Sequence, residues 1–239
     1  MPAPTDKPTT LPRLHTEADL SPGATIPGTP VHAHYLIHVL RRATGDTVRL
    51  FNGRDGEYAA TLTCGRRDNV CFTPTAQLRP QTPEPDIWLA LCLLKRDALE
   101  LTIQKATELG VSQILLVISE RTNAAHTNLD RLRAIATEAA EQSERLTIPL
   151  LHAPQKLPEL LAKWPSTRPL AAAIERATAP LPHDQQGLLI GPEGGFTPRE
   201  LDALHAAPFI QPVSLGCRVL RAETASIAGL ALLLVRSPI

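Results

Sequence analysis

Short apolar runs alternate with longer helical segments in the part of the chain after residue 86. Residues 87–94 are continuously apolar, and residues 97–109 have the spacing of a helix that Gly110 ends. Further strands are expected over residues 113–118, 188–190 and 210–215, and further helices over residues 129–145 and 198–207. Strands that alternate with helices form a parallel sheet covered on both faces. We therefore expect an α/β domain over residues 86–239.

A run with three prolines, residues 79–85, precedes that domain and cannot continue the interior of a strand or helix. Upstream of it, β-branched or alternating apolar residues occupy 47–51, 57–63 and 70–78, separated in part by the turn signals Asn52-Gly53 and Asp55-Gly56. This pattern predicts a small β-barrel or sandwich over residues 1–80. Residues 34–42 are typical of a short helix that ends in two arginines.

Charge and cysteine content point to no special environment. The 239 residues hold 24 basic and 24 acidic side chains, so no overall positive field attracts a nucleic acid. The first 14 residues lack the apolar core of a secretory signal, and the longest apolar run, residues 227–235, is shorter than the roughly 20 residues that cross a bilayer. The four cysteines show no metal or disulfide spacing. We therefore expect a cytoplasmic protein that does not contact membranes.

A glycine-rich segment joins a predicted strand directly to a predicted helix at residues 188–200. Thr197 is a good N-cap, Pro198 suits the first helical position, and Glu200 completes a capping box. The glycines between 191 and 195 allow a ligand to approach the backbone at the carboxyl edge of the sheet. The fingerprints of a P-loop and of a dinucleotide site are absent. A tight turn without a ligand remains an alternative for this segment taken alone.

A second strand-to-helix junction, residues 215–226, concentrates polar groups. Arg218 and Arg221 precede Glu223 and Thr224, at a helix start where the dipole favours an anion. Helix capping would explain Glu223 and Thr224 but not the two arginines. This junction is therefore a candidate for chemistry.

The two junctions together resemble the uracil-N3 methyltransferases of 16S ribosomal RNA, the RsmE family of the SPOUT class. The resemblance rests on Ile-Gly-Pro-Glu-Gly-Gly at 190–195 and on Leu-Gly-x-Arg-Val-Leu-Arg-x-Glu-Thr-Ala at 215–225. Weaker matches lie at residues 34–41, 102–111, 119–121 and 141–145, so the resemblance spans nearly the whole chain. Two departures stand out. Cys217 replaces a common proline, and Glu144 replaces a common glycine beside Arg145, which puts the local loop shape in doubt.

The resemblance implies a PUA-like, RNA-binding β-barrel followed by a SPOUT domain whose C-terminal chain forms a trefoil knot, an exception to unknotted topology. It also implies that S-adenosylmethionine binds between the two junction loops and that the protein is a homodimer, to which the apolar helix over residues 226–235 contributes. The implied cofactor-binding residues are Ile190, Gly191, Pro192, Glu193, Gly194, Gly195, Leu215, Gly216, Val219 and Leu220.

The implied substrate sets the chemistry that the site must perform. Uracil N3 becomes nucleophilic only after it loses its proton, so an oxyanion stabiliser and a proton acceptor are needed. We assign Arg221 to the first role and Glu223 to the second, with Thr224 beside them as a third catalytic candidate. Alternatively, Glu223 only orients Arg221 and water carries the proton. N3 lies on the base-pairing edge, so the target uridine must be unpaired or flipped.

The implied partner is 16S rRNA within the small ribosomal subunit. Our candidates for backbone contacts are Arg13, Arg41, Arg42, Lys95, Arg121 and Arg145. His34 and His38 have helical spacing but no third ligand nearby, so we expect no metal. A SPOUT enzyme that methylates a ribose or a tRNA base, and a non-catalytic RNA-binding assembly factor, remain the alternatives.

Overall fold

The computed structural model describes residues 11–122, 127–175 and 177–234, which form two compact units. The first unit runs to Pro83 and includes Ala140–Thr147, and the second contains Glu84–Ala139 and the chain from Ile148 onward. The change of unit at Pro83 falls within the predicted proline-rich linker. The sequence did not predict that residues 140–147 belong to the first unit.

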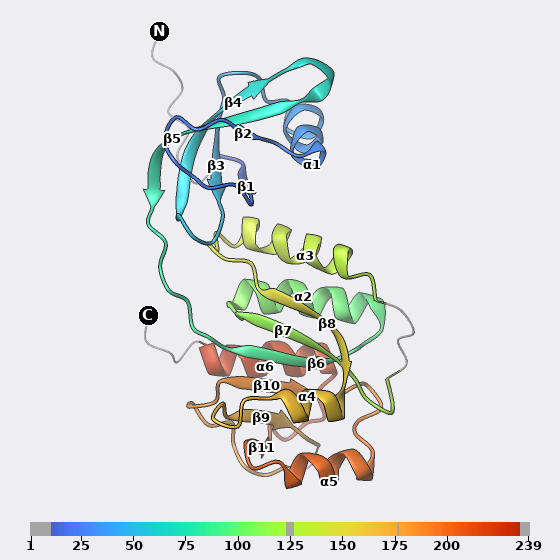
Figure 1. Ribbon diagram of the computed structural model, residues 1–239. Helices are drawn as coiled ribbons and strands as arrows, with labels where there is room; N and C mark the ends of the chain where they lie inside the picture. The colour runs from blue at the N-terminus through green and yellow to red at the C-terminus, as the bar shows by residue number, and fades with distance from the viewer. Residues whose placement is uncertain (1–10, 123–126, 176, 235–239) are drawn as a thin grey trace. The chain divides into compact units, whose positions relative to one another are not determined.

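The first unit is a curled five-stranded sheet with a short helical segment packed on it (Figure 1). Its strand order is β1-β3-β4-β5-β2, and only β1 and β3 pair in parallel. Register shifts in the pairing of β4 with β5 bend the sheet. Its core includes Leu36, Leu50 and Phe72. The elements are β1 (Arg13–His15), β2 (Ile26–Pro27), α1 (Pro30–Ala33), the π-helix η2 (His34–Val39), β3 (Thr47–Phe51), β4 (Glu57–Cys64), the 3₁₀ turn η3 (Arg66–Asp68) and β5 (Val70–Arg79).

The three strands predicted upstream of the linker are confirmed to within one residue. The predicted helix over residues 34–42 is too long, because the π-helix ends at Val39 and Arg41 takes a left-handed φ of 54°. Arg41 and Arg42 therefore lie after the helix and not on it.

A buried ion cluster binds the segment 140–147 into the first unit. Glu57 is 1% exposed and accepts hydrogen bonds from Arg13 Nε and Arg79 Nε. Burial opposes its charge, but these hydrogen bonds and charges outweigh burial and lower the pKa of the Glu57 carboxyl. Arg13 also donates to the carbonyl oxygens of Ala140 and Arg145, at 2.6 and 2.5 Å.

This cluster corrects two of the predicted RNA contacts. Arg13 and Arg145 are 6% and 8% exposed, so burial keeps both side chains from reaching a phosphate backbone. Glu144 has a φ of 60°, a backbone conformation that glycine adopts more freely than other residues. Its carboxylate accepts a hydrogen bond from Arg49 Nη2 at 2.9 Å.

The second unit is a six-stranded, fully parallel sheet of order β11-β9-β10-β6-β7-β8 (Figure 1). The predicted parallel sheet is therefore confirmed, although β8, β9 and α4 were not predicted. The elements are β6 (Trp88–Cys92), α2 (Arg96–Leu109), β7 (Gln113–Ile118), α3 (Leu129–Gln142), β8 (Leu150–Lys156), α4 (Leu157–Lys163), β9 (Leu170–Ala173), β10 (Gly187–Ile190), α5 (Pro198–Ala206), β11 (Ile210–Val213) and α6 (Ala222–Leu234).

Alternate residues of each strand face two separate cores. Leu188 and Ile190 of β10 pack with residues of α2 and α6, while Leu189 packs with residues of α4 and α5 on the other face. A Cβ at Gly229 would lie 2.6 Å from Leu188 Cδ2, so this glycine lets α6 approach β10 closely. No helix in the described ranges combines the length and apolar content needed to cross a membrane.

Candidate functional site

A cavity of about 1130 Å³ opens at the carboxyl ends of β6, β9 and β10 in the second unit. The chain runs from β6 to β7 and β8 on one side of the sheet, and then supplies β10, β9 and β11 on the other. Ligands of parallel α/β sheets bind at such a switch point, outside the carboxyl ends of the strands. The topology alone therefore identifies this edge as the candidate site.

The loop after β10 forms one wall of the cavity, and its ends are fixed locally. Thr197 Oγ1 accepts the N–H of Glu200, and Glu200 Oε2 accepts the N–H of Thr197 at 2.9 Å, so the predicted capping box is confirmed. Gly195 has a φ of 68°, and a Cβ at Gly191 would lie 3.0 Å from the Phe196 ring. The glycines thus permit both the turn and the close packing.

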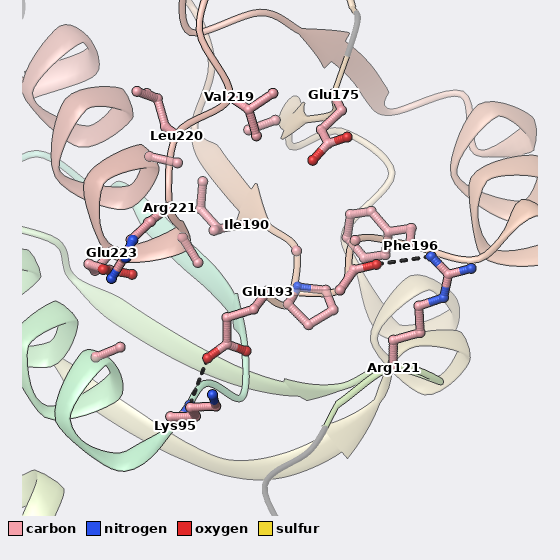
Figure 2. Close-up of a pocket in the computed structure, with 18 of the residues that line it drawn as sticks. Lys95, Arg121, Glu175, Ile190, Glu193, Phe196, Val219, Leu220, Arg221 and Glu223 are labelled. Carbon is pink, nitrogen blue, oxygen red and sulfur yellow. Dashed lines mark hydrogen bonds between the residues drawn. The ribbon is translucent and has the colours of Figure 1, made fainter.

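Two neighbouring segments hold this loop from opposite sides. The N–H of Lys95, after β6, donates to Glu193 Oε1 at 3.1 Å, and Arg121 Nη1, after β7, donates to the carbonyl of Gly194 at 2.9 Å (Figure 2). The N–H of Glu120 also donates to the buried carboxylate of Glu200 at 2.8 Å. The loop is therefore held in one conformation by three long-range hydrogen bonds.

The loop between β11 and α6 forms the facing wall and is much more exposed. Ser214 Oγ and Gly216 bond to each other, and Leu215 packs against the core, so neither Leu215 nor Gly216 borders the cavity. Val219 and Leu220 do line it, and the Val219 side chain is 77% exposed. Of the four cofactor-binding residues predicted in this loop, only Val219 and Leu220 therefore border the cavity.

The two loops present unpaired backbone donors beside apolar side chains. Within the described part of the chain, the N–H groups of Glu193, Gly194, Val219 and Leu220 have no hydrogen-bond acceptor. The apolar residues of the lining include Ile174, Ile190, Phe196 and Ala225. This combination suits a ligand with a flat apolar ring system and polar edges.

Two charged side chains stand at the edge of the cavity, at the start of α6. Arg221 and Glu223 line it on the side next to Leu220 (Figure 2), and in the ranges that the structure describes neither side chain has a hydrogen-bond or ion-pair partner. Thr224 is exposed and is not part of the lining. The structure thus brings two of the three predicted catalytic residues to the cavity.

Among the predicted RNA contacts, Lys95 and Arg121 line the cavity, and Arg41 and Arg42 belong to the first unit. Sequence reasoning missed Glu175 and Ile174, because they follow β9, whose Leu-Ala-Ala-Ala sequence carries no strand signal. It also missed Phe196, although this residue directly follows the glycine motif. Burial raises the pKa of the Cys92 thiol to about 12, so this cysteine at the end of β6 is not a nucleophile.

Comparison with known families assigns this fold and cavity to an RNA methyltransferase of the SPOUT class with a PUA-like domain. Residues 81–234 match the family model described as an RNA methyltransferase domain, and residues 33–73 match the one described as an RNA methyltransferase PUA domain.

Individual relatives define the family more closely. The chain is 35% identical over 207 residues to ribosomal RNA small subunit methyltransferase E of Rickettsia conorii, covering 84% of this chain and 85% of the relative. The Neisseria gonorrhoeae protein of that name, solved bound to S-adenosylmethionine, aligns with a TM-score of 0.83 and 32% identity over 92% of this chain and 95% of that one. A putative methyltransferase of Legionella pneumophila, also solved with this cofactor, aligns with a TM-score of 0.85 and 29% identity over 94% and 97%. The chain belongs to the ribosomal RNA small subunit methyltransferase E family.

Proposed function

We propose that this protein uses S-adenosylmethionine to methylate N3 of one uridine in the 16S rRNA of the small ribosomal subunit. The observation that carries the proposal is the cavity between the two strand-end loops, with Arg221 and Glu223 unpaired at its edge. The names of the Rickettsia and Neisseria relatives support the substrate class.

The lining offers polar and apolar groups that suit the proposed cofactor. Unpaired amides of Glu193 and Gly194 suit the polar edge of an adenine, and Ile190 and Phe196 supply apolar surface for its faces. The lining carries four carboxylates, Asp97, Glu175, Glu193 and Glu223, and four basic side chains, Lys95, Arg96, Arg121 and Arg221, so its formal charges balance. When bound, the cofactor supplies a methyl group on a sulfonium, which is already activated for transfer.

The protein side chains then have to make uracil N3 nucleophilic. The Arg221 guanidinium stabilises the negative charge that spreads to the uracil carbonyls when N3 loses its proton. The Glu223 carboxylate accepts or relays this proton, and N3 then takes the methyl group: the N–C bond forms as the C–S bond of the sulfonium breaks, and S-adenosylhomocysteine is the leaving group. In the competing arrangement, Glu223 only orients Arg221 and water removes the proton. Turnover of Glu223→Gln separates the two, because a base is lost in this variant while a hydrogen-bonding partner for Arg221 remains.

The proposed substrate must enter with an unpaired or flipped base. Lys95 and Arg121 are exposed cations on the cavity rim and suit the phosphates that flank such a base. Because the substrate is ribosomal, we place the protein in the cytoplasm.

We also propose that the protein is a homodimer that uses α6. This helix is apolar on nearly all sides, and Leu232 is 40% exposed at its end. Leu101 of α2 and Val219, both of the cavity lining, are exposed as well. Sedimentation of the wild type at the mass of two chains, and of Leu232→Glu at the mass of one, is the expected result. Wild type at the mass of one chain would contradict it.

The decisive experiment incubates the protein with labelled S-adenosylmethionine and small subunits from cells that lack the modification, followed by nucleoside mass spectrometry. N3-methyluridine is the expected product. A methylated ribose or another methylated base would assign the chain to a different SPOUT reaction. Absence of both transfer and cofactor binding would favour the non-catalytic binding factor.

A further inference from the structure

A second pocket, of about 310 Å³, lies in the first unit and belongs to none of the chemistry above. We propose that it binds a sugar-phosphate segment of the substrate RNA, with Arg67 as the main phosphate contact. The proposal rests on the proposed function only in taking RNA as the substrate. The lining includes Thr29, His34, His38, Arg67, Asp68 and Asn69.

The two walls of this pocket are fixed to each other. His34 and His38 of the π-helix form one wall, and the loop that carries Arg67 and Asp68 forms the other. His38 Nε2 and Asp68 Oδ2 lie 3.1 Å apart and join the walls. The loop itself is closed by the N–H of Gly65, which donates to the carbonyl of Asn69 at 2.7 Å. The pocket is therefore preformed rather than a gap between independent segments.

Backbone strain is concentrated around this pocket. Four non-glycine residues in the described ranges have a positive φ, and three of them, Arg41, Arg67 and Asp68, lie in the pocket loop or directly after the π-helix. Their φ values are 54°, 58° and 57°. Such conformations cost of order 1 kcal/mol or more each and gather where a side chain must be presented to a ligand. Here the strained backbone includes Arg67, which lines the pocket.

Arginines without a carboxylate partner lie in the lining of this pocket or close to it in the sequence. Arg13, Arg49, Arg54 and Arg79 all have carboxylate partners. Arg41, Arg66 and Arg67 are exposed, and within the residues that the structure describes they have none. The acidic residue in the lining, Asp68, is already engaged by His38. The planar donor groups of Arg67 suit a phosphate diester, and the exposed Arg66 beside it in the chain adds positive charge.

The test compares Arg67→Ala with Arg54→Ala as a matched control. Arg54 is a second exposed arginine of the same unit, paired with Asp19 at 3.0 Å and outside the pocket. Equilibrium binding to small subunits, and to deproteinised 16S rRNA, is measured from 50 to 300 mM salt, with no methyl transfer required. Melting temperatures and S-adenosylmethionine affinity are recorded for each variant.

We expect Arg67→Ala to weaken binding to both RNAs by about threefold to tenfold and to reduce the slope of log affinity against log salt by about 0.7, the loss of one phosphate contact. Arg54→Ala should match the wild type in slope. A folding defect would lower the melting temperature, whereas loss of a contact leaves it unchanged.

An unchanged salt slope in Arg67→Ala would overturn the proposal. So would weaker binding to subunits with unchanged binding to deproteinised rRNA, since the pocket would then contact a ribosomal protein. Failure of the wild type to methylate N3 of uridine, with the salt effect intact, would remove the proposed reaction and leave the RNA pocket in place.

Discussion

The two loops that border the cavity differ in how the rest of the protein holds them. Lys95, Glu120 and Arg121 all bond to the segment between Glu193 and Glu200, and a capping box fixes its helical end. The loop after β11 has a local bond at Ser214 and then exposes Val219 and Arg221. Residues of both loops line the same cavity.

This difference indicates that the two loops have different functions. A loop fixed before binding loses little conformational entropy when a ligand arrives, so it suits the cofactor. The loop after β11 leaves charged groups unpaired and a valine exposed. These groups remain free to contact the RNA substrate or a second subunit. The first loop should therefore control cofactor affinity, and the second should control turnover.

Arg221→Ala should produce the largest effect and should separate the two loops most clearly. We expect the turnover number on small subunits to fall by about 10²- to 10³-fold, as for the loss of one oxyanion donor, while cofactor affinity changes by less than about threefold. Steady-state kinetics and calorimetry measure the two quantities. Arg218→Ala, on the same exposed loop but outside the cavity lining, is the control and should retain turnover. Equal losses in both variants would contradict the role of Arg221.

Gly191→Ala tests whether the first loop controls the cofactor. The new methyl group would lie 3.0 Å from the Phe196 ring, so the loop or the ring must move by a few tenths of an ångström. We expect S-adenosylmethionine affinity to fall by about tenfold, or about 1.4 kcal/mol, with turnover at saturating cofactor largely retained. Unchanged affinity would show that the loop adapts and is not rigid.

Arg121→Ala should also lower the affinity for S-adenosylmethionine, but by less than Gly191→Ala. The hydrogen bond to Gly194 is charge-assisted but exposed, so we expect cofactor affinity to fall by about threefold to fivefold. Arg121→Lys should restore part of it, because an ammonium can still donate. If the Michaelis constant for subunits rises and cofactor affinity does not, Arg121 contacts RNA, as the sequence suggested.

Val219→Ser should give the smallest change in cofactor binding. Its side chain is 77% exposed and adds little buried area to the cavity, so affinity should stay within about twofold of the wild type. The sedimentation coefficient should respond more, if Val219 is covered in the proposed dimer. A large loss of cofactor affinity would show that the second loop closes over the cofactor and would erase the distinction between the loops.

The first loop was predictable because its signals are local. The capping box joins residues three apart, and the glycines lie within the seven residues between strand and helix. The parallel sheet was predictable for a related reason, since continuous apolar strands need cover on both faces. Alanine-rich β9 was not predictable, and the part of the lining contributed by Ile174 and Glu175 was missed with it.

Two of the six predicted RNA contacts, Arg13 and Arg145, are buried, because exposure is not a property of a residue type. Arg13 and Arg121 look alike in the sequence, yet one is buried against Glu57 and the other lines the cavity. Arg67 was not a candidate at all, because the strained loop and the bond between His38 and Asp68 appear only in three dimensions.

The sequence by itself determined the alternation of strands and helices that makes a parallel sheet, the two glycine- and arginine-rich junctions and, through them, the family. Periodicity and capping act over a few residues, and a motif is a local string. The tertiary structure decided which charges are buried, which loop is held and which is exposed. Those outcomes depend on pairs such as Arg121 and Gly194 or Arg13 and Arg145, which the chain brings together across 73 and 132 residues.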